Sequence, residues 1–197
     1  MNRTVNSQTL ARIVTEVCAP WVTNTVLFTV LGASTGALPA GVAAAALTGL
    51  IPMGGILLMM KRNTVGDHHV TTAHQRWPVY WMIFGCLMAL GVLLAILPTS
   101  LELWVGLMGA MLFIIAFAVV TRRGLKVSVH SGLWLVAFSY MGMAVHPWWW
   151  LGLVVLPVVI WSRLKLVHHT SKEIVGGVVI SAGIAALMML TLWGIRL

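Results

Sequence analysis

The sequence predicts an all-α integral membrane protein, a polytopic bundle of about six to seven transmembrane helices that forms one domain over residues 1–197. Two observations predict this class. Hydrophobic residues make up 60% of the chain and charged residues only 8%, which is outside the range of soluble domains. The apolar residues also lie in long runs, and a membrane-spanning helix needs about 20 such residues.

Seven apolar runs are the expected spans. They cover residues 17–36, 41–60, 79–98, 101–121, 131–146, 148–162 and 174–194. The fifth and sixth are short. Glycine- and proline-containing turns separate several of the spans. No stretch is long enough for a soluble domain, and the polar N-terminal residues 1–12 are expected to lead into an uncleaved first helix.

Most polar residues lie in three short stretches between the apolar runs: 69–78, 126–130 and 162–173. Polar groups at membrane depth are costly, and those that are kept there usually serve a function. Two predicted spans separate the first stretch from the second, and two more separate the second from the third. Because an even number of crossings returns the chain to the same membrane face, we expect all three stretches on one face.

The basic residues indicate which face this is. Eleven of the twelve Lys and Arg residues lie on the face of the three stretches, and only Arg196 lies opposite. Arg76, Lys126 and Arg163 could be basic for chemical reasons. Without these three, eight Lys and Arg residues remain on this face and one on the opposite face. By the positive-inside rule, we expect a multi-pass protein of the plasma or inner membrane with its active site on the cytoplasmic face.

The residue types in these stretches suit phosphoryl transfer. His169 is the candidate nucleophile, which would form a phosphohistidine. Glu173 lies four residues on, and on a helix it would orient the imidazole of His169. His130 is the candidate general acid. Four polar side chains are candidates for binding the phosphate oxygens: Arg76, Arg163, Ser128 and His69. The scheme requires no metal and no cofactor.

With these residues identified, the chain resembles the type 2 phosphatidic acid phosphatase superfamily, whose active site is shared with vanadium haloperoxidases. The family pattern is Lys-(six)-Arg-Pro, then Pro-Ser-Gly-His, then Ser-Arg-(five)-His-(three)-Asp. The third stretch, Ser162-Arg163-(five)-His169-(three)-Glu173, matches this spacing at every anchor, with Glu in place of Asp.

The other two stretches match in part. The second keeps Ser128 and His130, but valines stand where the family has Pro and Gly. The first keeps Arg76, has a tryptophan inserted before the proline, and has His69 at the position of the lysine. The resemblance covers roughly residues 60–180, and its strength lies in three motifs in the family's order and near its spacing.

The resemblance implies a metal-independent lipid phosphatase that hydrolyses a phosphomonoester or diphosphate of a lipid through a phosphohistidine. Phosphatidate, phosphatidylglycerophosphate and polyprenyl-linked phosphates are the implied substrates. The expected partners are the lipid phosphate substrate and the surrounding membrane lipids. Nothing in the sequence indicates binding to nucleic acid, and the sequence does not predict an oligomeric state.

Three alternatives stay open. The same site could pass the phosphoryl group to a lipid alcohol, which would make the protein a lipid phosphotransferase. The histidines of residues 67–69 and 168–169 could instead serve metal or proton binding in a small transporter. Glu173 also forms a capping-box pattern with Thr170, so it could act only as a helix cap.

Overall fold

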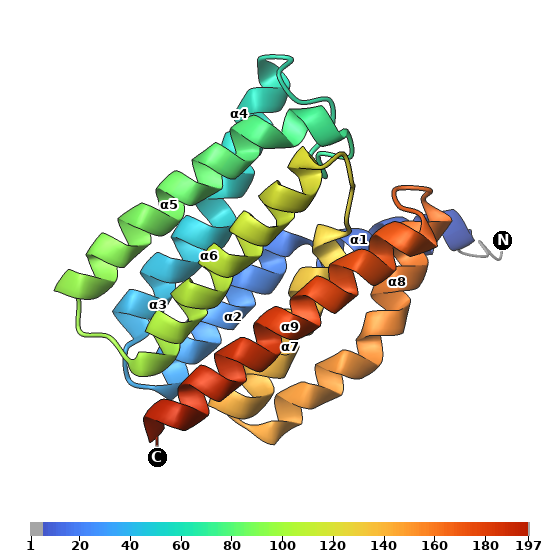
Figure 1. Cartoon of the computed structure of the whole chain (residues 1–197). Coiled ribbons are helices and arrows are strands. Elements are labelled where there is room, and N and C mark those ends of the chain that lie inside the picture. The colour runs from blue at the N-terminus through green and yellow to red at the C-terminus, as the bar shows by residue number, and fades with distance from the viewer. Residues whose placement is uncertain (1–5, 197) are drawn as a thin grey trace, which may run out of the picture.

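Helices that run alternately up and down build the protein in the computed structural model, which describes residues 6–196 (Figure 1). No strand occurs among these residues, so the predicted all-α bundle is confirmed. Six helical segments are long and apolar enough to cross a membrane: Ser7–Ser34, Leu38–Lys61, Arg76–Ile96, Leu101–Arg122, Pro147–Lys165 and Ser171–Arg196. A seventh helix, α7 (Val129–Ala144), is 16 residues long. These segments show a multi-pass membrane protein.

The passes consist of these elements. The first two contain α1 (Ser7–Val17), α2 (Pro20–Ser34), α3 (Leu38–Ala45), the π-helix η1 (Ala46–Leu50) and α4 (Ile51–Lys61). The short 3-10 helix η2 (Ala73–Gln75) precedes α5 (Arg76–Ile96), which is followed by α6 (Leu101–Arg122) and α7. The last two passes contain the 3-10 helix η3 (Pro147–Val155), α8 (Leu156–Lys165) and α9 (Ser171–Arg196).

The chain becomes helical earlier than the sequence predicted. Residues 1–5 lie outside the described part, but Ser7 already begins α1, in a segment expected to be a polar lead. Pro20 stands at the start of α2, where its missing N–H costs nothing, and the extended backbone of Ala19 separates the two helices. This break lets α1 turn away from α2 and pack against α8.

The short sixth predicted span crosses by a change of helix type. Its first nine residues form η3 and the next ten form α8. A 3-10 helix rises about 2.0 Å per residue and an α-helix about 1.5 Å, so the two together extend about 33 Å. That length matches a hydrocarbon core of about 30 Å. The 3-10 segment therefore lets a short run of residues cross.

The π-helix η1 in the second pass also has a local cause. Pro52 has no backbone N–H, so it cannot donate to the carbonyl of Thr48, four residues earlier. The side chain of Asn24 donates to this carbonyl at 3.0 Å instead. Because a free carbonyl at membrane depth is costly, a side chain from α2 replaces the missing hydrogen bond.

All three polar stretches lie at the same end of the bundle. The connections between α4 and α5, between α6 and α7, and between α8 and α9 lie at this end, near the start of α1, and the end of α9 lies at the other (Figure 1). Away from this end, fully buried apolar side chains such as Phe28, Leu31, Phe117 and Met188 form the core between the helices.

A close contact between α7 and α9 fixes the relation of the second stretch to the third. A Cβ atom on Gly177 would lie 2.8 Å from the carbonyl oxygen of Ser128, so no side chain fits there. The backbone N–H of Ser128 donates to the carbonyl of Glu173 at 3.2 Å. Small residues allow such close approach between membrane helices. The first turns of α7 and α9 are therefore held side by side.

Candidate active site

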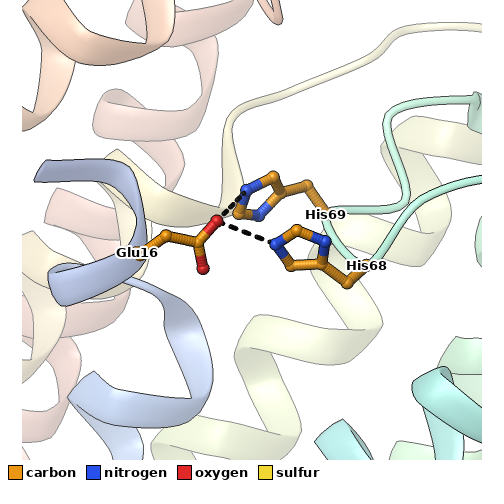
Figure 2. Close-up of side chains that lie close together, drawn as sticks. All are labelled: Glu16, His68 and His69. Carbon is orange, nitrogen blue, oxygen red and sulfur yellow. Dashed lines mark hydrogen bonds and ion pairs between the residues drawn. The ribbon is translucent and has the colours of Figure 1, made fainter. Parts of the chain in front are cut away.

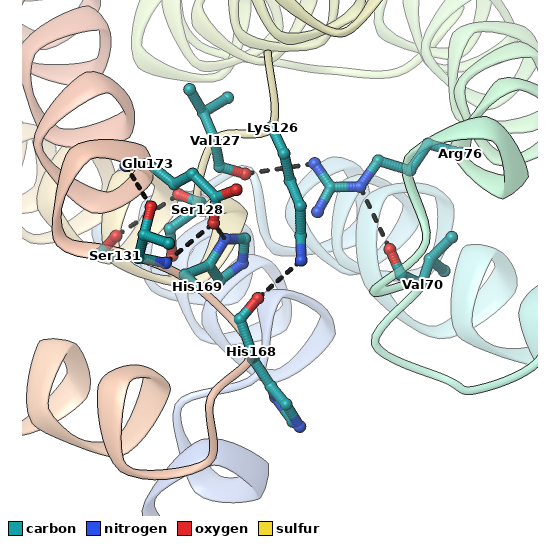
Figure 3. A network of polar contacts seen from close by, with 10 residues as sticks. Val70, Arg76, Lys126, Val127, Ser128, Ser131, His168, His169 and Glu173 are labelled. Atoms are coloured by element: carbon teal, nitrogen blue, oxygen red, sulfur yellow. Dashed lines mark hydrogen bonds and ion pairs between the residues drawn. The ribbon is translucent and has the colours of Figure 1, made fainter. Parts of the chain in front are cut away.

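The three polar stretches contact one another at the end of the bundle (Figure 3). Arg76 Nη1 of the first stretch donates to the carbonyl of Val127 in the second at 3.2 Å. Lys126 Nζ of the second donates to the carbonyl of His168 in the third at 2.7 Å. The ring of His69 lies 5.6 Å, centroid to centroid, from the ring of His168. Each stretch thus touches both of the others.

His169 and Glu173 form a hydrogen-bonded pair. His169 Nδ1 lies 3.1 Å from Glu173 Oε2, across one turn at the start of α9. Because a carboxylate can only accept, Nδ1 carries the proton and donates it, and Nε2 keeps its lone pair. The structure thereby places these two residues in the arrangement that a nucleophilic histidine needs.

Glu173 is at the same time the cap of α9. Its Oε2 accepts the backbone N–H of Thr170 at 2.9 Å, and its own N–H donates to Thr170 Oγ1 at 3.4 Å. This is the reciprocal capping box that the sequence allows as an alternative. One oxygen therefore serves both the helix terminus and the imidazole of His169, so the two interpretations of Glu173 are compatible.

Two valines in left-handed backbone conformations shape the loops of the site. Val167 has φ of 56° and follows the C-terminal end of α8, where the N–H of His168 donates to the carbonyl of Arg163 at 3.1 Å. Val70 has φ of 48°, and its carbonyl accepts Arg76 Nε at 3.1 Å. This conformation is unfavourable for a β-branched residue and costs about 1–3 kcal/mol. Val167 thus shapes the loop that leads to His169, and Val70 gives its carbonyl to Arg76.

The surroundings of His169 keep its imidazole neutral. Burial lowers the pKa of His169 to about 3, together with the positive charges of Arg163, Lys126 and Arg76. Figure 3 shows Lys126 between His169 and Arg76. The sequence marks Lys126 as a residue that could be basic for chemical reasons, but Lys126 was not among the predicted phosphate-binding residues. A neutral imidazole is the form that can attack phosphorus.

Arg76 and Arg163 are buried guanidinium groups that have only neutral partners. Their relative exposures are 5% and 1%. Arg76 donates to the carbonyls of Val70 and Val127, and Arg163 Nη1 donates to Thr15 Oγ1 at 3.5 Å. Among the described residues, no carboxylate oxygen lies within 4.0 Å of either group. An unpaired buried charge costs several kcal/mol, so these groups are suited to an anionic ligand.

Further polar atoms near the arginines have no hydrogen-bond partner. Seven buried side-chain N or O atoms of the described residues are unpartnered, and four of them belong to the second and third stretches: Ser128 Oγ, His130 Nε2, Arg163 Nε and His168 Nδ1. Buried polar groups are usually hydrogen-bonded, and a cluster of exceptions marks a place where a ligand can supply the partners. Ser128 and His130, both sequence candidates, are in this cluster.

His69 has a partner that the sequence did not indicate. Its ring lies 5.1 Å from that of His130, and its Nε2 lies 3.2 Å from Glu16 Oε1 on α1. Burial and the charge of Arg163 lower the pKa of His69 to about 4. At neutral pH this imidazole can meet a phosphate oxygen as an N–H donor rather than as a cation. Glu16 is one of only four acidic residues in the chain, and this rarity could have marked it in the sequence as a candidate site residue.

α1 belongs to the site, although its sequence carries none of the three motifs. Thr15 Oγ1 lies 3.0 Å from Ser162 Oγ and accepts from Arg163. Glu16, the next residue, contacts His68 and His69. The first helix therefore contacts Ser162 and Arg163, which open the third stretch. It also contacts His68 and His69 at the start of the first stretch.

An apolar cavity of about 160 Å³ opens from the polar groups into the bundle. His69, Arg76 and His130 line it, together with apolar side chains from α2, α4, α5, α6 and α7 such as Ile83, Leu87, Phe113, Ile114 and Leu133. Trp21, whose indole N–H has no hydrogen-bond partner in the described part of the chain, also lines the wall. The cavity thus has a polar end and an apolar interior.

Comparisons of the chain with known protein families, curated proteins and solved structures gave no match. The resemblance to the type 2 phosphatidic acid phosphatase superfamily therefore rests on the three motifs and stays a prediction.

The charge of Lys126 leads to a prediction about pH dependence. Lys126→Met removes a positive charge that disfavours the protonated form of His169, so the pKa of His169 rises. Because only the neutral imidazole can attack, the acid limb of the pH profile of kcat/KM moves to higher pH. Lys165→Met, at an exposed position on α8, serves as the matched control and leaves the limb in place. An unchanged acid limb in Lys126→Met contradicts the prediction.

Proposed function

We propose that the protein is a metal-independent lipid phosphatase that works through a phosphohistidine on His169. The observation that carries the proposal is the hydrogen-bonded pair His169–Glu173 beside two buried guanidinium groups, Arg76 and Arg163. Both groups are close enough to lower the pKa of His169, and neither has a carboxylate partner among the described residues. Arg76 and Arg163 would neutralise the phosphate oxygens with planar, multiply donating groups. Ser128, His69 and Lys126 would supply further donors around the same anion.

The proposed reaction has two steps. In the first, His169 Nε2 attacks phosphorus, the bond from phosphorus to the leaving oxygen breaks, and His130 gives that oxygen its proton. The Nδ1 proton of His169 stays in its hydrogen bond to Glu173, which stabilises the positive charge that develops on the ring. In the second, His130 takes a proton from water, the water oxygen bonds to phosphorus, and the P–N bond breaks. The products are inorganic phosphate and a lipid alcohol, or a lipid monophosphate where the substrate is a diphosphate.

The cavity supports an amphiphilic substrate. Its polar end at Arg76 and His130 would receive the phosphate, and the apolar interior would receive part of a hydrocarbon tail. The free indole N–H of Trp21 would donate to an oxygen acceptor in the linkage between phosphate and tail. A site at the end of a membrane bundle gives such a lipid direct access from the bilayer.

Phosphate release from a panel of lipid phosphates in detergent tests this function. We expect release in the presence of EDTA, because arginines rather than a metal ion neutralise the phosphate. His169→Ala is expected to show no release, and His130→Ala to lose about 10²–10⁴-fold in kcat. His146→Ala, which changes an exposed histidine at the opposite end, is the control and keeps activity. Wild-type release by His169→Ala, or loss of activity in EDTA, contradicts the proposal.

We also propose that the site faces the cytoplasm. The support is the distribution of basic residues: outside the motifs, seven Lys and Arg residues of the described part lie at the end of the site and one at the other end. The substrate would then be a lipid phosphate of the inner leaflet.

Cysteine labelling tests the orientation. In a background where Cys18 and Cys86 are replaced by serine, we expect Thr72→Cys to react with an impermeant thiol reagent only after the membrane is opened. Thr72 is exposed in the loop between α4 and α5. Ser34→Cys, exposed at the opposite end, is the matched control and reacts in intact cells. The reverse pattern places the site outside the cytoplasm.

A further inference from the structure

Glu16, His68 and His69 direct three potential metal ligands to one point beside the active site (Figure 2). Glu16 Oε1 lies 2.9 Å from His68 Nε2 and 3.2 Å from His69 Nε2. All three ligand atoms lie within 4.8 Å of one another. Glu16 comes from α1 and the histidines from the loop between α4 and α5, so the cluster joins two segments that are distant in sequence.

These separations are close to those of a zinc site. Zinc takes His nitrogen at about 2.0–2.1 Å and carboxylate oxygen at about 2.0–2.2 Å in a tetrahedron, so ligand atoms lie about 3.3–3.5 Å apart. The two oxygen-to-nitrogen distances of Glu16 are within a few tenths of an ångström of that value. Two histidines and one carboxylate are also a ligand set suited to zinc, with a fourth position left for water.

The loop is arranged to hold the two histidines in place. Asp67 Oδ1 accepts the backbone N–H of His69 at 2.9 Å, and its Oδ2 accepts the hydroxyl of Thr71 at 2.6 Å. Asp67 is thus a second acidic residue held close to the cluster.

Charge balance also suits a cation. Arg163 is close enough to oppose a cation at His69, and the two carboxylates of Glu16 and Asp67 offset that charge. Asp67 thus contributes through its charge and through the shape of the loop.

We propose that Glu16, His68 and His69 bind a zinc ion that ties α1 to the loop between α4 and α5. The next residue of that loop, Val70, gives its carbonyl to Arg76 Nε. The ion would therefore fix the backbone that orients Arg76, while the reacting atoms at His169 stay free of metal. It stabilises the loop and takes no part in phosphoryl transfer, so its removal by EDTA lowers the Tm while phosphate release continues.

Direct metal binding by the full-length protein in detergent tests this site. After removal of metal with EDTA and exchange into chelator-free buffer, we expect one equivalent of Zn²⁺ by calorimetry. Co²⁺ in its place is expected to give the intense visible absorption of a tetrahedral centre. Zn²⁺ should also raise the Tm of the wild-type protein. None of these three readouts depends on enzyme activity, so the test is separate from that of the phosphatase.

Ligand variants and a matched control make the test specific. Removing a residue that only hydrogen-bonds to a metal ligand costs about 10–100-fold in metal affinity. His68 and Glu16 would bind the metal directly, so we expect His68→Ala and Glu16→Gln to weaken Zn²⁺ binding by at least about 100-fold. Both variants should also lose the Zn²⁺-dependent rise in Tm. His74→Ala removes an exposed histidine of the same loop and is expected to bind as the wild type does. Size-exclusion chromatography is the control for folding. Where a variant elutes at the same volume as the wild-type protein, its weaker Zn²⁺ binding reflects the lost ligand and not misfolding.

Two outcomes would overturn the proposal. One is the absence of stoichiometric Zn²⁺ or Co²⁺ binding to the wild-type protein. The other is binding that survives in His68→Ala and Glu16→Gln but is lost in His168→Ala, which would place the metal among the histidines of the third stretch.

Discussion

The burial of Arg76 and Arg163 without a carboxylate partner among the described residues is the constraint on which the rest of this structure depends. Two guanidinium charges held away from water are unfavourable, and backbone carbonyls and one threonine hydroxyl satisfy them only in part. Together with burial, which has the larger effect, these charges lower the pKa of His169, and they suit the site to an anionic ligand. A phosphate group would bring negative charge to both arginines, which connects the electrostatics of the site to the proposed reaction.

The packing of the helices brings three segments that are distant in sequence to one end of the bundle. Gly177 allows α9 to approach Ser128, and Asn24 completes the hydrogen bonding of the π-helix that lies along the cavity. Left-handed backbone at Val70 and Val167 then sets the loops that hold Arg76 and His169. Strain of this kind persists only where the surrounding contacts fix it. The helical packing and the polar site are therefore parts of one arrangement.

Much of this could be predicted from the sequence because it depends on local patterns. Apolar runs of membrane length predict the helices, and counting the passes between polar stretches places all three at one end. The pairing of His169 with Glu173 follows from a spacing of four residues on a helix. The sequence predicted seven spans. It did not predict the 3-10 segment that lengthens the sixth, because its composition does not differ from that of an α-helix.

Contacts that depend on tertiary structure could not be predicted. Residues 1–12 read as a polar lead, and only the folded chain shows α1 against α8 with Glu16 beside His68 and His69. The position of Lys126 between Arg76 and His169 depends on how a loop turns after α6, which no local pattern sets. The left-handed conformations of Val70 and Val167 could not be predicted from the sequence either, because valine rarely adopts positive φ.

The most direct measurement of the central claim is the site of covalent phosphorylation. His130→Ala, which lacks the proposed proton donor, would be incubated with an activated phosphomonoester whose leaving group needs no proton, quenched, and digested for mass spectrometry. The account predicts an acid-labile phosphate, stable in alkali, on His169. Phosphate on another residue, or the same phosphorylation in His130→Ala/His169→Ala, would contradict it.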